Sequence, residues 1–278
     1  MRIVTYRGEG GDRAGVLVGD GVDAWNALGG DGSTVRELLA SGRVEELRTA
    51  AESAPTVPLA DVELLPPVPD PDKIVCIGLN YRSHAAEAGI DPPETPTFFA
   101  KFRNALAPPG ATVPLPAASG KVDFEAEVAF VIGRECREVE VAEARSYVAG
   151  YVLLNDLSAR DLQFATPQWM PGKVFDGSAP CGPALVTPEE GEVDKSISFS
   201  LELNGELMQD ASTDDLIFGV PQLVAHLSRL MTLEPGDIVA TGTPAGVGST
   251  RDPRVWLKPG DEIVISSPTL GRLETRIA

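Results

Sequence analysis

The sequence predicts a mixed α+β fold with many strands and few helices. Short runs rich in β-branched and aromatic residues recur along the chain, and turn-forming residues separate them. Helical spacing of apolar residues is confined to a few short segments such as 221–231. This segment has a proline in its first turn and is predicted to bury Leu223, Val224, Leu227 and Leu230. The length of 278 residues allows one large domain, alone or with a small one.

The chain divides at a proline-rich segment. Residues 66–71 read Pro-Pro-Val-Pro-Asp-Pro, and alternating prolines favour an extended connector over a helix or a sheet interior. Residues 1–65 are predicted to form a small N-terminal domain with strands at 2–6 and 14–18. A capping-box pattern at Thr34-Val-Arg-Glu37 predicts a helix start in this domain. The second domain is predicted to span residues 72–278.

The charge of the chain excludes some classes of partner. The net charge is −18, which disfavours binding to nucleic acid or to an anionic membrane surface. An anionic small-molecule substrate would need a local positive site. The three cysteines are scattered, which favours a reducing compartment, and no segment resembles a signal peptide or a membrane span. We therefore expect a cytoplasmic protein.

Three acidic residues form a candidate metal site. Residues 123–133 are predicted to be a strand, so Glu125 and Glu127 point to the same face. Asp156 follows the apolar segment 147–154, which has the composition of a buried strand or the end of a core helix. Oxygen-only ligands suit Mg²⁺ or Mn²⁺, with Ca²⁺ also compatible. On spacing alone, the alternative is a solvated strand face and a helix cap.

Three motifs carry a resemblance to a known family. Asp-Phe-Glu-Ala-Glu at 123–127, Asn-Asp-Leu-Ser-Ala-Arg-Asp-Leu-Gln at 155–163 and Gly-Lys-Val-Phe-Asp-Gly at 172–177 occur in order. Together they resemble the fumarylacetoacetate hydrolase superfamily, in its branch of acylpyruvases, fumarylpyruvate hydrolases and 2-hydroxyhepta-2,4-diene-1,7-dioate isomerases. The resemblance covers nearly all of residues 72–278. It implies a β-barrel or roll there, a small N-terminal domain, a homodimer, and the metal-site interpretation of the three acids.

A histidine and a glutamate form a candidate acid–base pair. His84 and Glu87 are three residues apart in a predicted short helix, so they lie on one face. A carboxylate beside an imidazole orients the ring and raises its basicity. An ordinary surface pair is the alternative on spacing alone. The resemblance implies that the pair lies on a lid over the substrate and activates water.

The resemblance also implies roles for five further residues. Lys101 lies in the predicted strand 97–102, where a lysine could equally reach the surface. Phe102 and Asn104 depart from the family's pattern after this lysine, which leaves the pocket shape open. The expected substrate-binding residues are Lys101, Arg160, Gln163 and Thr243, and Lys173 is the expected catalytic cation.

The predicted function is metal-assisted hydrolysis of a carbon–carbon bond in an acylpyruvate-type 2,4-dioxo acid such as fumarylpyruvate. Water activated by His84 and Glu87 would attack the distal carbonyl, which releases a carboxylic acid and pyruvate enolate, and Lys173 would stabilise the enolate charge. Isomerisation of a 2-hydroxy-dienedioate and decarboxylation of oxaloacetate use the same site chemistry and remain alternatives. A non-catalytic metal-binding oligomer is a third.

Overall fold

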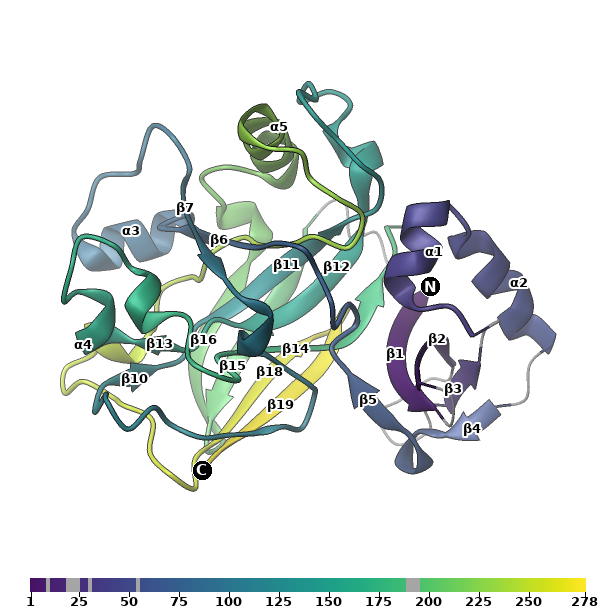
Figure 1. The fold of residues 1–278 in the computed structure, drawn as a ribbon. Helices are drawn as coiled ribbons and strands as arrows, with labels where there is room; N and C mark the ends of the chain where they lie inside the picture. The colour runs from purple at the N-terminus through teal and green to yellow at the C-terminus, as the bar shows by residue number, and fades with distance from the viewer. Residues whose placement is uncertain (9–10, 19–25, 30–31, 54–55, 189–195) are drawn as a thin grey trace.

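The computed structural model describes the whole chain except residues 9–10, 19–25, 30–31, 54–55 and 189–195 (Figure 1). Strands dominate the described residues and helices are few and short, which confirms the predicted mixed α+β class. The strands form one large sheet, one five-stranded sheet and one two-stranded ribbon. Among the described residues the strand order of the large sheet has two ends, so the expected strand-rich core is present without a closed barrel.

The large sheet runs through both parts of the chain. Its strands in spatial order are β4 (Thr56–Pro58), β3 (Asn26–Gly29), β2 (Gly11–Val18), β1 (Arg2–Gly8), β14 (Ala179–Val186), β12 (Val148–Asn155), β11 (Ala126–Ile132), β17 (Ile238–Ala240), β6 (Ile74–Gly78) and β7 (Thr97–Lys101). Beside this path, β5 (Glu63–Leu65) pairs with β1 and β8 (Leu106–Ala107) with β14.

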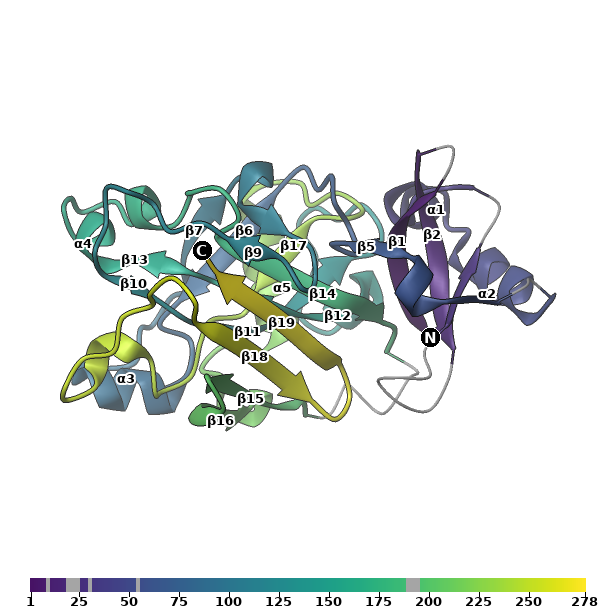
Figure 2. The ribbon, with the colours of Figure 1, turned by 90° about the horizontal axis from the view of Figure 1, so that it is seen from below.

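The five-stranded sheet covers the central strands of the large one. It is formed by β16 (Glu206–Ser212), β15 (Ser198–Leu203), β18 (Glu262–Ser267), β19 (Gly271–Ile277) and β9 (Thr112–Val113). β19 packs against β12 and β14, and Figure 2 shows β18 and β19 beside these strands. At Asn204-Gly205 both residues have positive φ, which is the geometry of the type I′ hairpin turn that this pair predicts.

Strand β11 is the centre of the fold because it is buried on both faces. Val128, Phe130 and Ile132 enter one hydrophobic core, and Ala129 and Val131 enter the other. The alternation of side chains along a strand explains this division. Packing on both faces holds the start of β11 in place, and Glu125 and Glu127 lie at that start.

The N-terminal residues join the same sheet. β1 pairs with β14 in antiparallel register, with Arg2 opposite Val186. Helix α1 (Val35–Ser41) begins at the predicted capping box, in which Thr34 and Glu37 exchange hydrogen bonds, and α2 (Val44–Ser53) follows it. Residues 65–68, at the start of the proline-rich segment, are buried.

The remaining helices are α3 (Arg82–Ala88), α4 (Arg160–Gln163) and α5 (Val220–Leu230), with 3₁₀ turns such as η5 (Thr213–Asp215) and η6 (Gly248–Thr250) between strands. α5 buries Leu223, Val224 and Leu227 as its spacing predicts. The expectation that Leu230 is also buried was wrong, since the helix ends there and its side chain is 54% exposed. Every described helix is too short or too polar to cross a membrane.

Candidate active site

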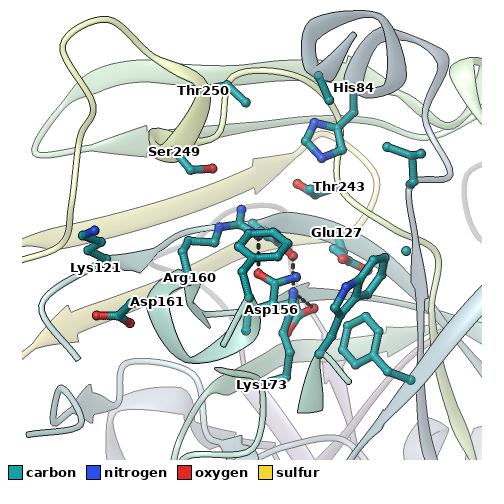
Figure 3. A pocket seen from close by; sticks show the side chains of 18 of the residues that line it. His84, Lys121, Glu127, Asp156, Arg160, Asp161, Lys173, Thr243, Ser249 and Thr250 are labelled. Atoms are coloured by element: carbon teal, nitrogen blue, oxygen red, sulfur yellow. Dashed lines mark hydrogen bonds and ion pairs between the residues drawn. The ribbon is translucent and has the colours of Figure 1, made fainter. Parts of the chain in front are cut away.

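The candidate site lies in a cavity of about 570 Å³ between β6, the end of β12, α3 and the loops around 160–173 and 243–256 (Figure 3). Such a volume is typical of a small-molecule site. Eight of the ten residues that the sequence predicts for the site line this cavity, and Glu87 and Lys101 do not. These eight are His84, Glu125, Glu127, Asp156, Arg160, Gln163, Lys173 and Thr243.

The pairing of β11 with β12 brings the three acids together. Ala126 lies opposite Asn155, so Glu125 just before β11 meets Asp156 just after β12. The Asp156 N–H donates to the Glu125 carbonyl at 2.9 Å. All three acids are buried, and ligand oxygens from Glu125, Glu127 and Asp156 lie within 4.8 Å of one another. The alternative of a solvated strand face and a helix cap is therefore wrong.

Positive side chains compensate two of the acids. Lys173 Nζ lies 2.8 Å from Glu125 Oε2 and 2.7 Å from Asp156 Oδ2. Arg160 Nη1 lies 2.6 Å from Glu125 Oε1. Burial raises the pKa of Glu125, but the charges of Lys173 and Arg160 outweigh burial and lower it to about 2. Burial alone would lower the pKa of Lys173, whereas Asp156 and Glu125 raise it, so the lysine is charged at neutral pH.

Glu127 lacks such compensation. Among the described residues, its carboxylate accepts one hydrogen bond, from the Gly242 N–H at 2.8 Å. Burial, followed by the charges of Asp156 and Glu125, raises the pKa of Glu127 well above its usual value. A buried carboxylate that repels two neighbours is stabilised by a cation. The donor set therefore fits a divalent metal ion held by Glu125, Glu127 and Asp156.

Lys101 lies beneath the cavity instead of lining it. Its Nζ lies 2.5 Å from Asp156 Oδ1 and 3.3 Å from the Leu157 carbonyl, and the side chain is buried. The alternative that this lysine reaches the surface is wrong. Its contacts fit a role in holding Asp156 better than the predicted contact with substrate.

Arg160 is fixed by a residue that the sequence analysis missed. Asp123 is fully buried and accepts hydrogen bonds from Arg160 Nε and from the N–H groups of Gly248 and Ser249. Arg160 Nη1 also donates to Gln163 Oε1 at 3.0 Å. Asp123 thus ties α4 to the glycine-rich loop. Its place as the first acid of the Asp-Phe-Glu-Ala-Glu motif was the signal that could have identified it.

Thr243 lines the cavity, but its hydroxyl is occupied. It donates to the Ala126 carbonyl at 3.0 Å and accepts from Gln209 Nε2 at 2.9 Å. The hydroxyl proton is therefore committed to the backbone. The predicted role of Thr243 in binding a substrate carboxylate would rely on its backbone N–H instead.

His84 and Glu87 lie on one face of α3, as their spacing predicts. His84 Nδ1 is 3.3 Å from Glu87 Oε2, and Figure 3 shows the ring directed toward Thr243 and the acids. Glu87 Oε1 also accepts from the Gly246 N–H at 3.0 Å. The glutamate therefore orients the imidazole and fastens α3 to the glycine-rich loop.

An aromatic wall closes another side of the cavity. Trp169 packs edge-on against Phe99, with ring centroids 6.0 Å apart. A side chain at Gly78 would lie 2.3 Å from the Trp169 ring, so this glycine gives the indole its space. Trp169 lies in an irregular segment, and periodicity therefore gave no signal for it.

The model of the fumarylacetoacetate (FAA) hydrolase C-terminal domain matches residues 73–278. The chain belongs to the fumarylacetoacetate hydrolase family. The human protein named "Oxaloacetate tautomerase FAHD2A, mitochondrial" is 36% identical over 100% of this chain and 91% of its own length. The rat "Oxaloacetate tautomerase Fahd2a, mitochondrial" is 39% identical over 83% of this chain and 74% of its own length.

Solved structures in the family have the same fold. A putative HpcE protein from Mycobacterium smegmatis has a TM-score of 0.86 at 35% identity, covering 100% of this chain and 99% of its own. The fumarylacetoacetate hydrolase from Exiguobacterium antarcticum has a TM-score of 0.88 at 31% identity with the same coverage. A probable 2-hydroxyhepta-2,4-diene-1,7-dioate isomerase from Mycobacterium abscessus has a TM-score of 0.84 at 33% identity, covering 100% and 98%. The predicted family is thus confirmed.

Proposed function

We propose that this family member catalyses enolisation of a 2-oxo acid, moving a proton at the carbon beside the 2-oxo group in a tautomerase or isomerase reaction. The observation that carries the proposal is the position of the His84 ring, which faces the three buried acids across the cavity. The names of the curated relatives and several structural neighbours, which describe tautomerases and isomerases, support the same reaction class.

The proposed metal centre consists of Glu125, Glu127 and Asp156. Mg²⁺ and Mn²⁺ both suit three carboxylates, and Ca²⁺ would also be accepted. When bound, the ion would act as a Lewis acid on the 2-oxo group and carboxylate of the substrate. Lys101 would keep Asp156 in position from beneath.

Lys173 is the proposed electrostatic partner of the enolate. Its ammonium group is held between Glu125 and Asp156, so its position is set before the substrate arrives. A fixed positive charge beside an oxygen that becomes negative stabilises the transition state. Since the surrounding carboxylates raise the pKa of Lys173, it would act as a cation and not as the base.

His84 is the proposed proton carrier. Imidazole groups exchange protons near neutral pH, and a hydrogen bond from Nδ1–H to Glu87 would leave Nε2 free to remove a proton from the substrate. Returning the proton to oxygen or to a different carbon would complete tautomerisation or isomerisation. Arg160 and Gln163 are proposed to orient the substrate from the opposite side of the cavity.

Hydrolysis of an acylpyruvate is the second candidate. The His84–Glu87 pair that favours proton transfer is equally suited to activating water for attack on a distal carbonyl. Decarboxylation of oxaloacetate needs no activated water. It should therefore survive the change His84→Ala, whereas hydrolysis and tautomerisation should not.

The proposal is tested by exposing Mg²⁺-loaded protein to oxaloacetate and a small set of acylpyruvates in deuterated water. We expect faster decay of enol absorbance and deuterium at the carbon beside the 2-oxo group, both lost in His84→Ala. Release of pyruvate and a second acid from an acylpyruvate would instead identify the hydrolase. Carbon dioxide release that survives His84→Ala would identify a decarboxylase.

We also propose a homodimer that acts on a small-molecule 2-oxo acid in the cytoplasm. Light scattering behind a sizing column tests the dimer directly, with a mass near twice 29.3 kDa expected. A mass near that of one chain would contradict it. The net charge of −18 gives no support for binding to nucleic acid or an anionic membrane.

A further inference from the structure

A buried asparagine lies between the helix that carries His84 and the loop that holds Glu127. Asn80 is in the turn between β6 and α3, two residues before the helix begins. Its side chain is fully buried and is not part of the cavity lining. Asn80 therefore acts on the site through its hydrogen bonds and not through contact with a substrate.

The carboxamide of Asn80 uses both of its polar atoms. Oδ1 accepts from the Phe218 N–H at 2.9 Å, and Nδ2 donates to the Phe218 carbonyl at 3.1 Å. Nδ2 also donates to the Thr241 carbonyl at 2.8 Å. Because an asparagine side chain has two N–H donors, these bonds use its full donor capacity. The side chain is thus fixed between residue 218 and the residue that follows β17.

The bond to Thr241 reaches the metal centre through a single peptide group. The Thr241 carbonyl and the Gly242 N–H belong to the same peptide group, which is planar and rigid. This N–H donates to Glu127 Oε2 at 2.8 Å. A tilt of the peptide on the Asn80 side therefore moves the donor that holds the Glu127 carboxylate.

Gly242 allows Asn80 and this peptide group to approach each other closely. Its φ is +101°, a conformation that side chains other than glycine rarely adopt. A Cβ at this position would lie 3.0 Å from the Ile77 carbonyl oxygen and 3.1 Å from Asn80 Cβ. The contact between Asn80 and the peptide group therefore depends on the glycine.

The backbone of Asn80 is tied to the segment that caps α3. The Asn80 carbonyl accepts from the Ile217 N–H at 2.7 Å. Two residues before Ile217, Asp215 of η5 accepts the Ser83 N–H in the first turn of α3. A shift of Asn80 would therefore disturb the start of the helix and the direction of the His84 ring.

We propose that Asn80 is a positioning residue that couples Glu127 to α3, so that metal binding and the placement of His84 support each other. This rests on the metal centre and the role of His84 proposed above, and it adds a link between the two. Coupling between two sites is reciprocal. An ion that fixes Glu127 should therefore steady α3, and loss of the Asn80 side chain should weaken binding of the ion.

Hydrogen exchange in the wild type tests the coupling without a substrate. Mass spectrometry compares exchange in residues 82–88 with and without saturating Mn²⁺. We expect exchange in α3 to be about fivefold or more slower with Mn²⁺, the lower end of typical coupling between sites, while exchange in α1 stays the same. Equal exchange of α3 in the two conditions would overturn the proposal.

Asn80→Ala removes the link. Mn²⁺ affinity measured by calorimetry should fall about 10-fold or more, as for other outer-shell partners of metal ligands. The ratio of α3 exchange rates without and with Mn²⁺ should fall toward one. A side chain that only stabilised the fold would speed exchange equally in both conditions and leave this ratio unchanged.

Ser228→Ala is the matched control, since it removes a fully buried hydrogen-bonding side chain on α5, outside the cavity. It should keep both the Mn²⁺ affinity and the exchange ratio of the wild type. A folded Asn80→Ala protein that keeps both would overturn the proposal, and the wild-type comparison decides even where this variant does not fold. Coupling without enolisation would overturn only the proposed function.

Discussion

Glu127 is the residue whose environment depends most on a metal ion. It is buried, its carboxylate accepts a single hydrogen bond among the described residues, from Gly242, and the charges of Asp156 and Glu125 repel it. Its ionised carboxylate destabilises the metal-free protein and would serve as a ligand in the metal-loaded protein. The same residue should therefore have opposite effects on stability and on metal affinity.

Glu127→Gln tests this balance. The amide oxygen can still accept from the Gly242 N–H, so the fold should persist, and removal of one charge should leave metal-free stability equal or higher. Affinity for Mn²⁺ should fall by more than about 100-fold, since even outer-shell partners change metal affinity about 10–100-fold. Calorimetry and thermal unfolding in a chelator measure the two effects. Glu202→Gln, at an exposed position of β15, is the control, and unchanged Mn²⁺ affinity in Glu127→Gln would refute the metal centre.

The pKa of Glu125 is shifted in the opposite direction to that of Glu127, and this shift makes stability depend on pH. Its pKa is lowered from 4.5 to about 2, because Lys173 and Arg160 outweigh the effect of burial. A lowered pKa in the folded state gives stability that is fully present above about pH 4.5 and is lost as the pH falls toward 2. The shift corresponds to about 3 kcal/mol at most.

Urea unfolding of metal-free wild type and Glu125→Gln from pH 6 to pH 3 measures this contribution. Glutamine keeps the size of the side chain but cannot carry the charge. The wild type should be more stable at pH 6, and the difference between the two proteins should narrow below about pH 4.5. Two unfolding profiles that stay parallel across this range would mean that the pairing with Lys173 and Arg160 adds nothing to stability.

At the scale of elements, α3 depends on bonds from a distant part of the chain. Tyr81 precedes the helix but provides no side-chain cap. Asp215 in η5 instead accepts the Ser83 N–H at 2.9 Å, and Arg82 donates to the Leu216 carbonyl. The segment that carries His84 is therefore held at its start by η5 and at its end by the bond between Glu87 and Gly246.

Asp215→Ala should loosen α3 without unfolding the protein. Loss of a cap costs about 0.5–2 kcal/mol, so hydrogen exchange in residues 82–88 should become faster and activity should fall by about 3–30-fold. Mass spectrometry of exchange and steady-state kinetics provide the readouts. Asp214→Ala removes the same charge from the neighbouring residue and should leave exchange in α3 unchanged. Equal exchange in the two variants would show that Asp215 does not cap the helix.

At the scale of the whole molecule, the N-terminal strands stabilise the fold at a distance from the site. Ile3 in β1 is 1% exposed and shares a hydrophobic core with Leu185 of β14. The described residues that line the cavity all lie beyond residue 76. We therefore expect the first 65 residues to affect stability and not catalysis.

Ile3→Ala separates these two effects. Removing buried methyl groups should destabilise the protein by about 2–5 kcal/mol, while KM for a 2-oxo acid stays within error of wild type. Thermal unfolding and kinetics well below the melting temperature are the measurements. Val57→Ala, at a position 43% exposed on β4, should change neither quantity. A changed KM with unchanged stability would place the N-terminal part in the function of the site.

Local patterns predicted much of the secondary structure and the residues of the candidate metal centre. The capping box at Thr34 and the turn at Asn204-Gly205 depend on neighbours in sequence, so both were found in place. Leu230 was misjudged because helical spacing does not reveal where packing of the helix ends. The sequence left barrel and roll open, since closure depends on strand pairs far apart in the chain, and the described strand order does not close.

The sequence by itself determined the family, the predominance of strands, the three candidate metal ligands and the pairing of His84 with Glu87, because motifs and spacings of a few residues carry this information. Only the tertiary structure decided that Lys101 lies beneath Asp156 and that Asp123 ties Arg160 to Gly248. These contacts join segments between 37 and 125 residues apart, and such contacts arise from sheet pairing and packing that no local pattern specifies.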